Sequence, residues 1–170
     1  MNFLRLALLA ALAVQAAELP SPARAPASIE LRDQFDAPQK LSFPATNLTL
    51  LTIADKKGSA QVDAWIAALK PKCDGRIDIR GLADCGGAPG FFQARIRKRF
   101  QETRTYPVML DWTGQVCAQF GYTKSMANLL VLGRDGVIQA RFTGEATPAA
   151  IAQAEAALDQ ALSTPVVTKP

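Results

Sequence analysis

The stretch LLVLGRDGVIQARFTGEATPAAI, residues 129–151, holds two apolar runs separated by the turn sequence GRDG. Gly and Asp in such a turn favour a β-hairpin, so residues 129–132 and 137–142 are predicted to be paired strands. Thr147 is a suitable helix N-cap and Pro148 a suitable first helical residue, which predicts that a helix follows the hairpin. Helical spacing then marks its inward side, which consists of Ile151, Leu158 and Leu162.

Upstream of this stretch, strands and helices alternate. Residues 48–54 (LTLLTIA) contain no charge and no helix breaker, which is typical of a strand covered on both faces. We expect a helix next, capped by Ser59 and stopped by Pro71, with Val62, Trp65, Ile66 and Leu69 facing inward. The other expected elements are a hairpin within 29–43, strands at 76–82 and 107–111, a helix with Phe92, Ile96 and Phe100 inward, and a helical turn at 116–120.

This order of elements predicts an α/β fold. Alternation of strands and helices implies parallel strands with helices on both faces, and the late hairpin adds antiparallel strands at one side. The expected architecture is a three-layer α/β/α domain with a central mixed sheet and an N-terminal β-hairpin extension. With 170 residues, 49% of them hydrophobic, the chain is long enough for one such domain.

The N-terminus reads MNFLRLALLAALAVQAAELP, in which Arg5 precedes an apolar run over residues 6–14. Val14 and Ala16 suit the positions before a cleavage site, so residues 1–16 are expected to be a signal peptide; the alternative is a buried N-terminal helix. Residues 17–28 then form a linker, 29–162 the domain and 163–170 a disordered tail. The run is too short for a transmembrane segment, which needs about 20 residues. The expected location is periplasmic or secreted.

Composition excludes several kinds of function. The chain contains no histidine, which removes Ser-His-Asp catalysis, Cys-His catalysis and His-ligated zinc. Glycine-rich phosphate motifs are absent as well, and no metal site or cofactor is expected. A net charge of +4 is too small to indicate nucleic-acid binding.

The segments YPVMLDWTGQVCAQFGY (residues 106–122) and 129–151, in this order of elements, resemble the redoxin branch of the thioredoxin superfamily. That branch includes peroxiredoxin-like and TlpA-like proteins, and the periplasmic YtfJ-type group is the most similar. The resemblance covers roughly residues 29–162 and implies a thioredoxin-like fold. In redox-active relatives, the loop after the first core strand carries Cys-x-x-Cys or a peroxidatic Cys at a helix N-terminus, which lowers the thiol pKa.

Measured against this family pattern, the chain lacks the sulfur. Lys57, Gly58, Ser59 and Ala60 occupy the place of Cys-x-x-Cys, and none of them can form a disulfide. The family's cis-proline, which faces the thiols and binds the substrate backbone, is matched by Ala127, where a trans bond is expected. A shifted alignment would use Pro107 instead, but it leaves the hairpin at 129–142 unexplained. Activity as an ordinary dithiol oxidoreductase is therefore not expected.

Three cysteines remain, and Cys85 is the candidate catalytic residue among them. It lies in ADCGGAPGFF, at the end of a predicted strand and before a helix, where an open α/β sheet binds ligands. The alternative is an incidental thiol packed under the loop. Cys73 precedes the same strand, whose length of about 20 Å should keep the two apart. Cys117 is expected to be buried and inert.

Three functions follow from these observations. The leading hypothesis is a non-catalytic binding or accessory role at the C-terminal edge of the sheet, around residues 55–59, 84–87 and 124–128, with an unknown protein or small ligand as the partner. The first alternative is a single-cysteine thiol oxidoreductase or peroxide-reactive protein that uses Cys85. The second is docking on an anionic surface through the basic cluster of the second helix, Arg95, Arg97, Lys98 and Arg99, which is otherwise a solvated helix face.

Overall fold

The computed structural model describes residues 24–73 and 75–164. The predicted signal peptide, most of the linker and most of the tail lie outside these residues. The elements are β1 (Ser28–Arg32), β2 (Pro38–Ser42), β3 (Leu48–Ala54), α1 (Ser59–Leu69), η1 (Lys70–Lys72), β4 (Ile77–Asp84), η2 (Gly90–Phe92), α2 (Gln93–Thr103), β5 (Val108–Asp111), α3 (Gln115–Gln119), β6 (Asn128–Leu132), β7 (Ile138–Thr143) and α4 (Pro148–Ser163).

Five strands form one mixed sheet in the order β5-β4-β3-β6-β7. β3, β4 and β5 are parallel, whereas β6 pairs antiparallel with β3 and β7 pairs antiparallel with β6. β1 and β2 form a separate antiparallel hairpin, with Ile29 opposite Leu41. The mixed central sheet and the N-terminal hairpin are confirmed, as is the pairing of the two late strands.

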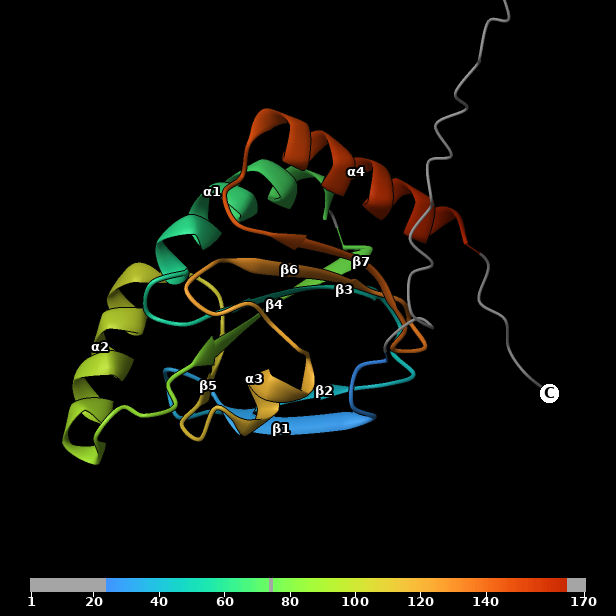
Figure 1. Cartoon of the computed structure of the whole chain (residues 1–170). Helices are drawn as coiled ribbons and strands as arrows, with labels where there is room; N and C mark the ends of the chain where they lie inside the picture. The colour runs from blue at the N-terminus through green and yellow to red at the C-terminus, as the bar shows by residue number, and fades with distance from the viewer. Residues whose placement is uncertain (1–23, 74, 165–170) are drawn as a thin grey trace, which may run out of the picture.

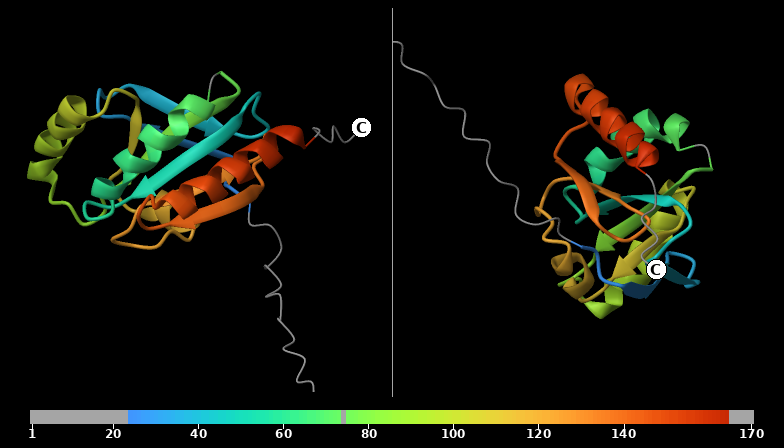
Figure 2. Two further views of the ribbon diagram at one scale, coloured as in Figure 1. Left: turned by 90° about the horizontal axis from the view of Figure 1, so that it is seen from above. Right: turned by 90° about the vertical axis from the view of Figure 1, so that its right-hand side faces the viewer.

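The sheet has a layer on each face (Figure 1). α1 and α4 cover one face, while α3 and the hairpin β1–β2 lie on the other, and α2 stands beside the β5 edge (Figures 1 and 2). Alternation along β3 separates two cores, because successive side chains of a strand point to opposite faces. Leu48 and Leu50 pack with α1 and α4, whereas Leu51 and Ile53 pack with α3 and the hairpin.

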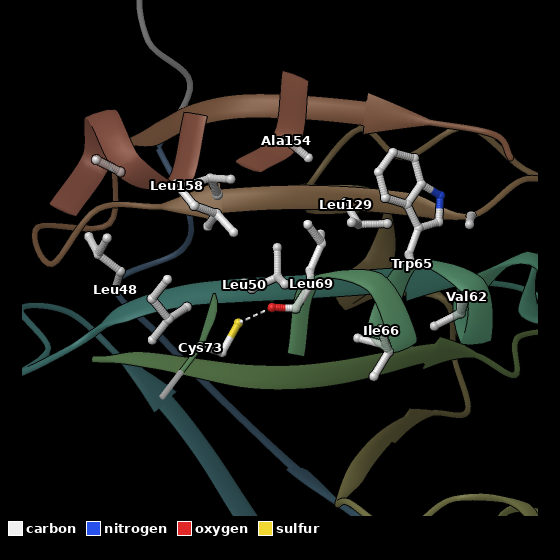
Figure 3. Close-up of a cluster of buried hydrophobic side chains, with 14 of the residues drawn as sticks. Leu48, Leu50, Val62, Trp65, Ile66, Leu69, Cys73, Leu129, Ala154 and Leu158 are labelled. Atoms are coloured by element: carbon white, nitrogen blue, oxygen red, sulfur yellow. Dashed lines mark hydrogen bonds between the residues drawn. The ribbon is translucent and has the colours of Figure 1, made fainter. Parts of the chain in front are cut away.

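Trp65 of α1 is the largest side chain of the first core and has no exposed surface. Figure 3 shows it beside Leu129 of β6 and near Ala154 of α4. Its indole Nε1–H donates to the Gly144 carbonyl at 2.8 Å, so its polar atom is satisfied although the ring is buried. The four residues predicted to face inward on this helix, Val62, Trp65, Ile66 and Leu69, are all buried.

The end of the domain also follows its sequence signals. Gly136 closes the β6–β7 turn at φ +83°, a backbone conformation that favours glycine. The Thr147 hydroxyl accepts from the Ala150 N–H at 3.2 Å and caps α4, with Pro148 in the first turn. α4 continues to Ser163, one residue into the predicted tail.

Two local predictions are wrong. Phe92 was expected on the inward side of α2, but it lies in η2 before the helix begins and is 41% exposed. Ile96 and Phe100 do pack inward, against the end of the sheet. Ser59 was expected to cap α1, but the N-cap is Gly58, and the Ser59 hydroxyl donates to the Lys56 carbonyl at 2.9 Å.

The β5 edge of the sheet is closed by Gln34, which follows β1 and is fully buried. Its amide side chain imitates a neighbouring strand: Oε1 accepts from the Val108 N–H at 2.8 Å, and Nε2 donates to the Tyr106 carbonyl at 2.9 Å. Gln101 of α2 donates in turn to the Gln34 carbonyl at 2.7 Å. The Gln34 side chain therefore ties the segment after β1 to the sheet, and it supplies partners to two backbone groups of the β5 edge that would otherwise lack them.

Replacing Gln34 with Ala should lower the free energy of unfolding by about 1–3 kcal/mol, because the buried Val108 N–H loses its acceptor. Urea unfolding followed by circular dichroism measures this difference. Gln153→Ala, on the exposed side of α4, is the matched control and should stay within about 0.5 kcal/mol of the original protein. Equal effects of the two substitutions would contradict the role given to Gln34.

Candidate functional site

The carboxyl ends of the three parallel strands each lead to an aspartate. Asp55 directly follows β3, while Asp84 and Asp111 are the last residues of β4 and β5. Asp84 pairs in register with Asp111, and Ala54 pairs with Ala83, so the three aspartates follow one another across the sheet edge. We call this group the aspartate row and its surroundings the carboxyl edge, which is where open α/β sheets bind ligands.

Asp55 occupies the backbone N–H groups before α1. Its Oδ1 accepts from Lys57 N–H at 3.0 Å and Gly58 N–H at 2.9 Å, and its Oδ2 accepts from Ser125 N–H at 2.8 Å. Burial alone would raise the pKa of Asp55, but these three bonds outweigh it and lower the pKa below its usual value. A carboxylate of the chain itself therefore fills the positive end of the helix.

Asp111 and Asp84 close turns in the same way. The carboxylate of Asp111 accepts from the N–H groups of Thr113, Gly114 and Cys117 at 3.2, 3.0 and 2.9 Å. Burial raises the pKa of Asp111, but the bonds from Cys117 and Thr113 prevail and lower it. Asp84 accepts from Gly86 N–H at 2.8 Å and from the Tyr122 hydroxyl.

The aspartate row is thus engaged with the chain's own donors rather than open to a metal ion. Within the described residues, no group of three or more acidic or cysteine side chains is arranged to hold one.

The four residues predicted to replace a dithiol lie at the start of α1: Lys57 and Gly58 precede the helix, and Ser59 and Ala60 are its first two residues. Lys57 and Ala60 are exposed, Ser59 is partly exposed and Gly58 is buried. Gly58 abuts the backbone of the segment 125–127, since a Cβ atom there would lie 2.2 Å from the Met126 carbonyl oxygen. Only glycine therefore allows these two segments to meet.

Ala127, the predicted counterpart of the family's proline, is buried and its backbone is fully used. Its N–H donates to Gln61 Oε1 at 2.9 Å, and its carbonyl accepts from Gly144 N–H at 2.8 Å. Among the described residues only the Phe43–Pro44 bond is cis, so the bond before Ala127 is trans as expected.

Asn128 holds this segment through side-chain hydrogen bonds; sequence reasoning placed it within the edge segment 124–128 but did not identify this role. Its Nδ2 donates to the carbonyls of Thr123 and Met126 at 2.8 and 3.0 Å, and its Oδ1 accepts from Thr123 N–H at 2.8 Å. A polar residue at the start of an otherwise apolar strand was the available signal. Together with Gln61, it fixes the segment 123–128 against the beginning of α1.

The thiols of the carboxyl edge lie beneath its surface. Cys85 is 8% exposed and Cys117 is fully buried. Burial is the main cause that raises the pKa of Cys85 to about 12, and the charges of Asp84 and Asp111 raise it further. Burial and the same two aspartates also raise the pKa of Cys117. This edge therefore disfavours a thiolate at both positions.

Cys73 belongs to a different part of the molecule. It packs in the core of α1 and α4, where its Sγ donates to the Leu69 carbonyl at 3.3 Å (Figure 3). Cys85 packs with α2 and the end of β5, and strand β4 runs between the two residues. The expected separation of Cys73 from Cys85 agrees with this arrangement.

Comparison with known proteins supports the fold. No model of a protein family and no curated protein sequence matches the chain. Solved structures do match, and three of them illustrate the range. A putative thiol:disulfide interchange protein DsbE from Chlorobium tepidum shares 18% identity at a TM-score of 0.67, covering 85% of this chain and 99% of its own.

The other structures are similar at the same level. Peroxidoxin BcpB from Mycobacterium tuberculosis shares 21% identity at a TM-score of 0.57, covering 84% of this chain and 96% of its own. The pneumococcal exposed lipoprotein thioredoxin from Streptococcus pneumoniae shares 15% identity at a TM-score of 0.59, and the match covers 75% of this chain and 97% of that structure. Taken with the sheet order and the hairpin extension, these likenesses show that the chain has the thioredoxin fold.

Proposed function

We propose that this chain is an exported thioredoxin-fold protein that has no dithiol site and serves as a non-catalytic binding or accessory protein. The observation that carries the proposal is the state of the loop before α1. Asp55 takes the backbone N–H groups there, and Lys57, Gly58, Ser59 and Ala60 bring no sulfur. The positive end of a helix that would acidify a thiol is filled by a carboxylate instead.

The second support is the backbone opposite this loop. Ser125, Met126 and Ala127 direct their N–H or carbonyl groups to partners within the chain, namely Asp55, Asn128, Gln61 and Gly144. A substrate peptide that paired with this backbone would have to displace those bonds. A partner at the carboxyl edge would therefore contact exposed side chains such as Lys57, Lys124 and Met126.

Export has support from the N-terminal sequence and from one structural likeness. The apolar run at residues 6–14 fits a signal peptide. One protein of the same fold is an exposed lipoprotein, as its name states. None of the described helices has the length and apolar character needed to cross a membrane.

The alternative function uses Cys85 as a single reactive thiol. It is favoured by position, because Cys85 lies on the carboxyl edge and is followed by two glycines. Its burial and the neighbouring aspartates work against it, because only the thiolate is nucleophilic. The reactivity of this thiol separates the two functions.

Thiol labelling should be slow in the folded protein at neutral pH and should reach three thiols per chain only after unfolding. Because the pKa of Cys85 is about 12, its labelling rate should rise about tenfold per pH unit above pH 7, with no midpoint below pH 8. The same raised pKa affects folding stability. In the unfolded chain the thiol has a pKa of about 9.0, so above pH 9 the unfolded thiol releases its proton while the folded one keeps it. The free energy of unfolding should therefore be unaffected by this thiol below pH 9 and decrease above it. A midpoint below pH 8 that disappears in Cys85→Ser would favour the alternative function.

Disulfide reduction is the direct test of the proposal. Reduction of insulin by dithiothreitol should proceed at the same rate with the protein as without it, and Cys85→Ser should change nothing. A clear acceleration by the unchanged chain would refute the non-catalytic role. Loss of that acceleration in Cys85→Ser would assign it to this thiol.

The double variant Lys57→Cys/Ala60→Cys tests whether residues 57–60, at the start of α1, are the position where redox-active proteins of this fold carry their two cysteines. We expect it to form a disulfide and to reduce insulin severalfold faster than the unchanged chain, because two thiols then stand at the Cys-x-x-Cys spacing, although Asp55 keeps the backbone N–H groups that would lower their pKa further. A matched pair, Gln153→Cys/Ala156→Cys, has the same spacing on the exposed side of α4 and should remain at background. Equal rates of insulin reduction for both pairs would show that residues 57–60 are not the redox position of this fold.

A further inference from the structure

The most exposed apolar side chains of the described residues include a pair at the start of α2. Phe91 is 80% exposed and Phe92 41% exposed, and their ring centroids lie 4.4 Å apart. Exposing two neighbouring aromatic rings to water costs free energy, because apolar surface is more stable when it is removed from water. An exposed pair of this kind points to an interaction surface.

The rings continue into a helix face that is basic. η2 leads directly into α2, since Phe92 has a helical backbone at φ −91° and ψ −11°. Phe91, Arg95 and Lys98 follow one another at spacings of four and three residues, which places them on one face. The half-buried positions of the segment lie on the other side and are Gln93, Ile96, Arg97, Phe100 and Arg104.

Positive charge is concentrated on this segment. Residues 90–104 contain five basic residues and one acidic residue, a net charge of +4 that equals the net charge of the whole chain. Arg97 faces the body of the domain, where it pairs with Asp36 at 3.1 Å and lies over the ring of Trp112. Arg104 likewise pairs with Asp63.

Two of the outward cations, Arg95 and Arg99, have no such partner among the described residues: their guanidinium groups have no ion pair or hydrogen bond there, and both side chains are exposed. Lys98 reaches only Glu102, at 3.9 Å. We call Phe91, Phe92, Arg95, Lys98 and Arg99 the α2 tip.

We infer that the α2 tip docks on an anionic phospholipid surface. The two rings would enter the boundary between headgroups and acyl chains, and Arg95, Lys98 and Arg99 would lie against lipid phosphates. α2 stands at one end of the molecule, beside the sheet rather than over it (Figure 2). The chain would then attach to a membrane without crossing it, because the contact needs only a turn and one helix face.

The small size of the tip and its combination of rings and cations favour a bilayer over an acidic protein. A stable protein partner buries about 800 Å² on each side of the interface, which exceeds what a single turn and one helix face offer. A bilayer accepts a small protruding tip, since rings and cations sit together at the headgroup level. The docking surface also differs from the basic cluster expected from the sequence, because Arg97 is not part of it.

Vesicle sedimentation tests the inference with the full chain, its N-terminal residues unchanged in every variant. Vesicles of equal parts phosphatidylglycerol and phosphatidylcholine should bind more protein than pure phosphatidylcholine, and added salt should abolish the difference. Phe91→Ala should weaken binding about tenfold or more, and Arg95→Ala or Arg99→Ala about fivefold each. The matched controls are Met126→Ala, which removes an apolar side chain that is 44% exposed on the carboxyl edge, and Lys124→Ala.

A tryptophan placed at the tip supplies a second measurement. The emission of Phe91→Trp should shift to shorter wavelength on the anionic vesicles and be quenched by brominated lipid, whereas Met126→Trp should not respond. Three outcomes would overturn the inference: equal binding to both kinds of vesicle, equal weakening by the control substitutions, or a tip tryptophan that stays in water. Binding to polyglutamate that is as strong as binding to the vesicles and insensitive to Phe91→Ala would assign the surface to an acidic partner instead.

Discussion

The carboxylate of Asp55 governs the chemistry of this domain. It accepts three backbone N–H bonds, two from the turn before α1 and one from Ser125 in the segment before β6. These bonds join two segments that are 70 residues apart in the chain, and they fill the positive end of α1. Because the donors are backbone groups, no substitution of Lys57 or Ser59 alone would free them. The loop is therefore a structural joint between β3, α1 and β6, whatever partner the protein binds.

The same arrangement repeats at the ends of the next two strands and explains the state of the cysteines. Asp84 and Asp111 stabilise turns by accepting hydrogen bonds from backbone N–H groups, so each carboxylate is fixed in position. Their charges lie beside Cys85 and Cys117, where they add to the effect of burial and oppose thiolate formation. The carboxylates that hold the carboxyl edge together thus add to the suppression of thiol chemistry there, of which burial is the main cause. Stability and reactivity are in direct conflict at this edge.

The fold could be predicted because its signals are local. The uncharged run at 48–54, the helical spacing of Val62, Trp65, Ile66 and Leu69, and the GRDG turn each specify an element within a few residues. The details of the site depend on bonds between distant residues, and these leave no local pattern. Gln34 reaches Val108 and Gln61 reaches Ala127 through single side-chain amides. Neither Gln has a sequence context that distinguishes it from a surface residue.

The inward and outward residues of α2 show a different limit of sequence reasoning. Helical spacing placed Ile96 and Phe100 correctly, but it cannot tell where the helix begins, and η2 keeps Phe92 out of the packed face. Spacing also treats neighbouring cations alike, although Arg97 is drawn inward by Asp36 and Trp112 while Arg95 and Arg99 are not. An arginine bound to the body of a domain contributes little to an external contact, because its charge is already matched. The number of cations in a helix therefore overstates its docking charge, and the useful quantity is the number left without a partner beside exposed apolar surface.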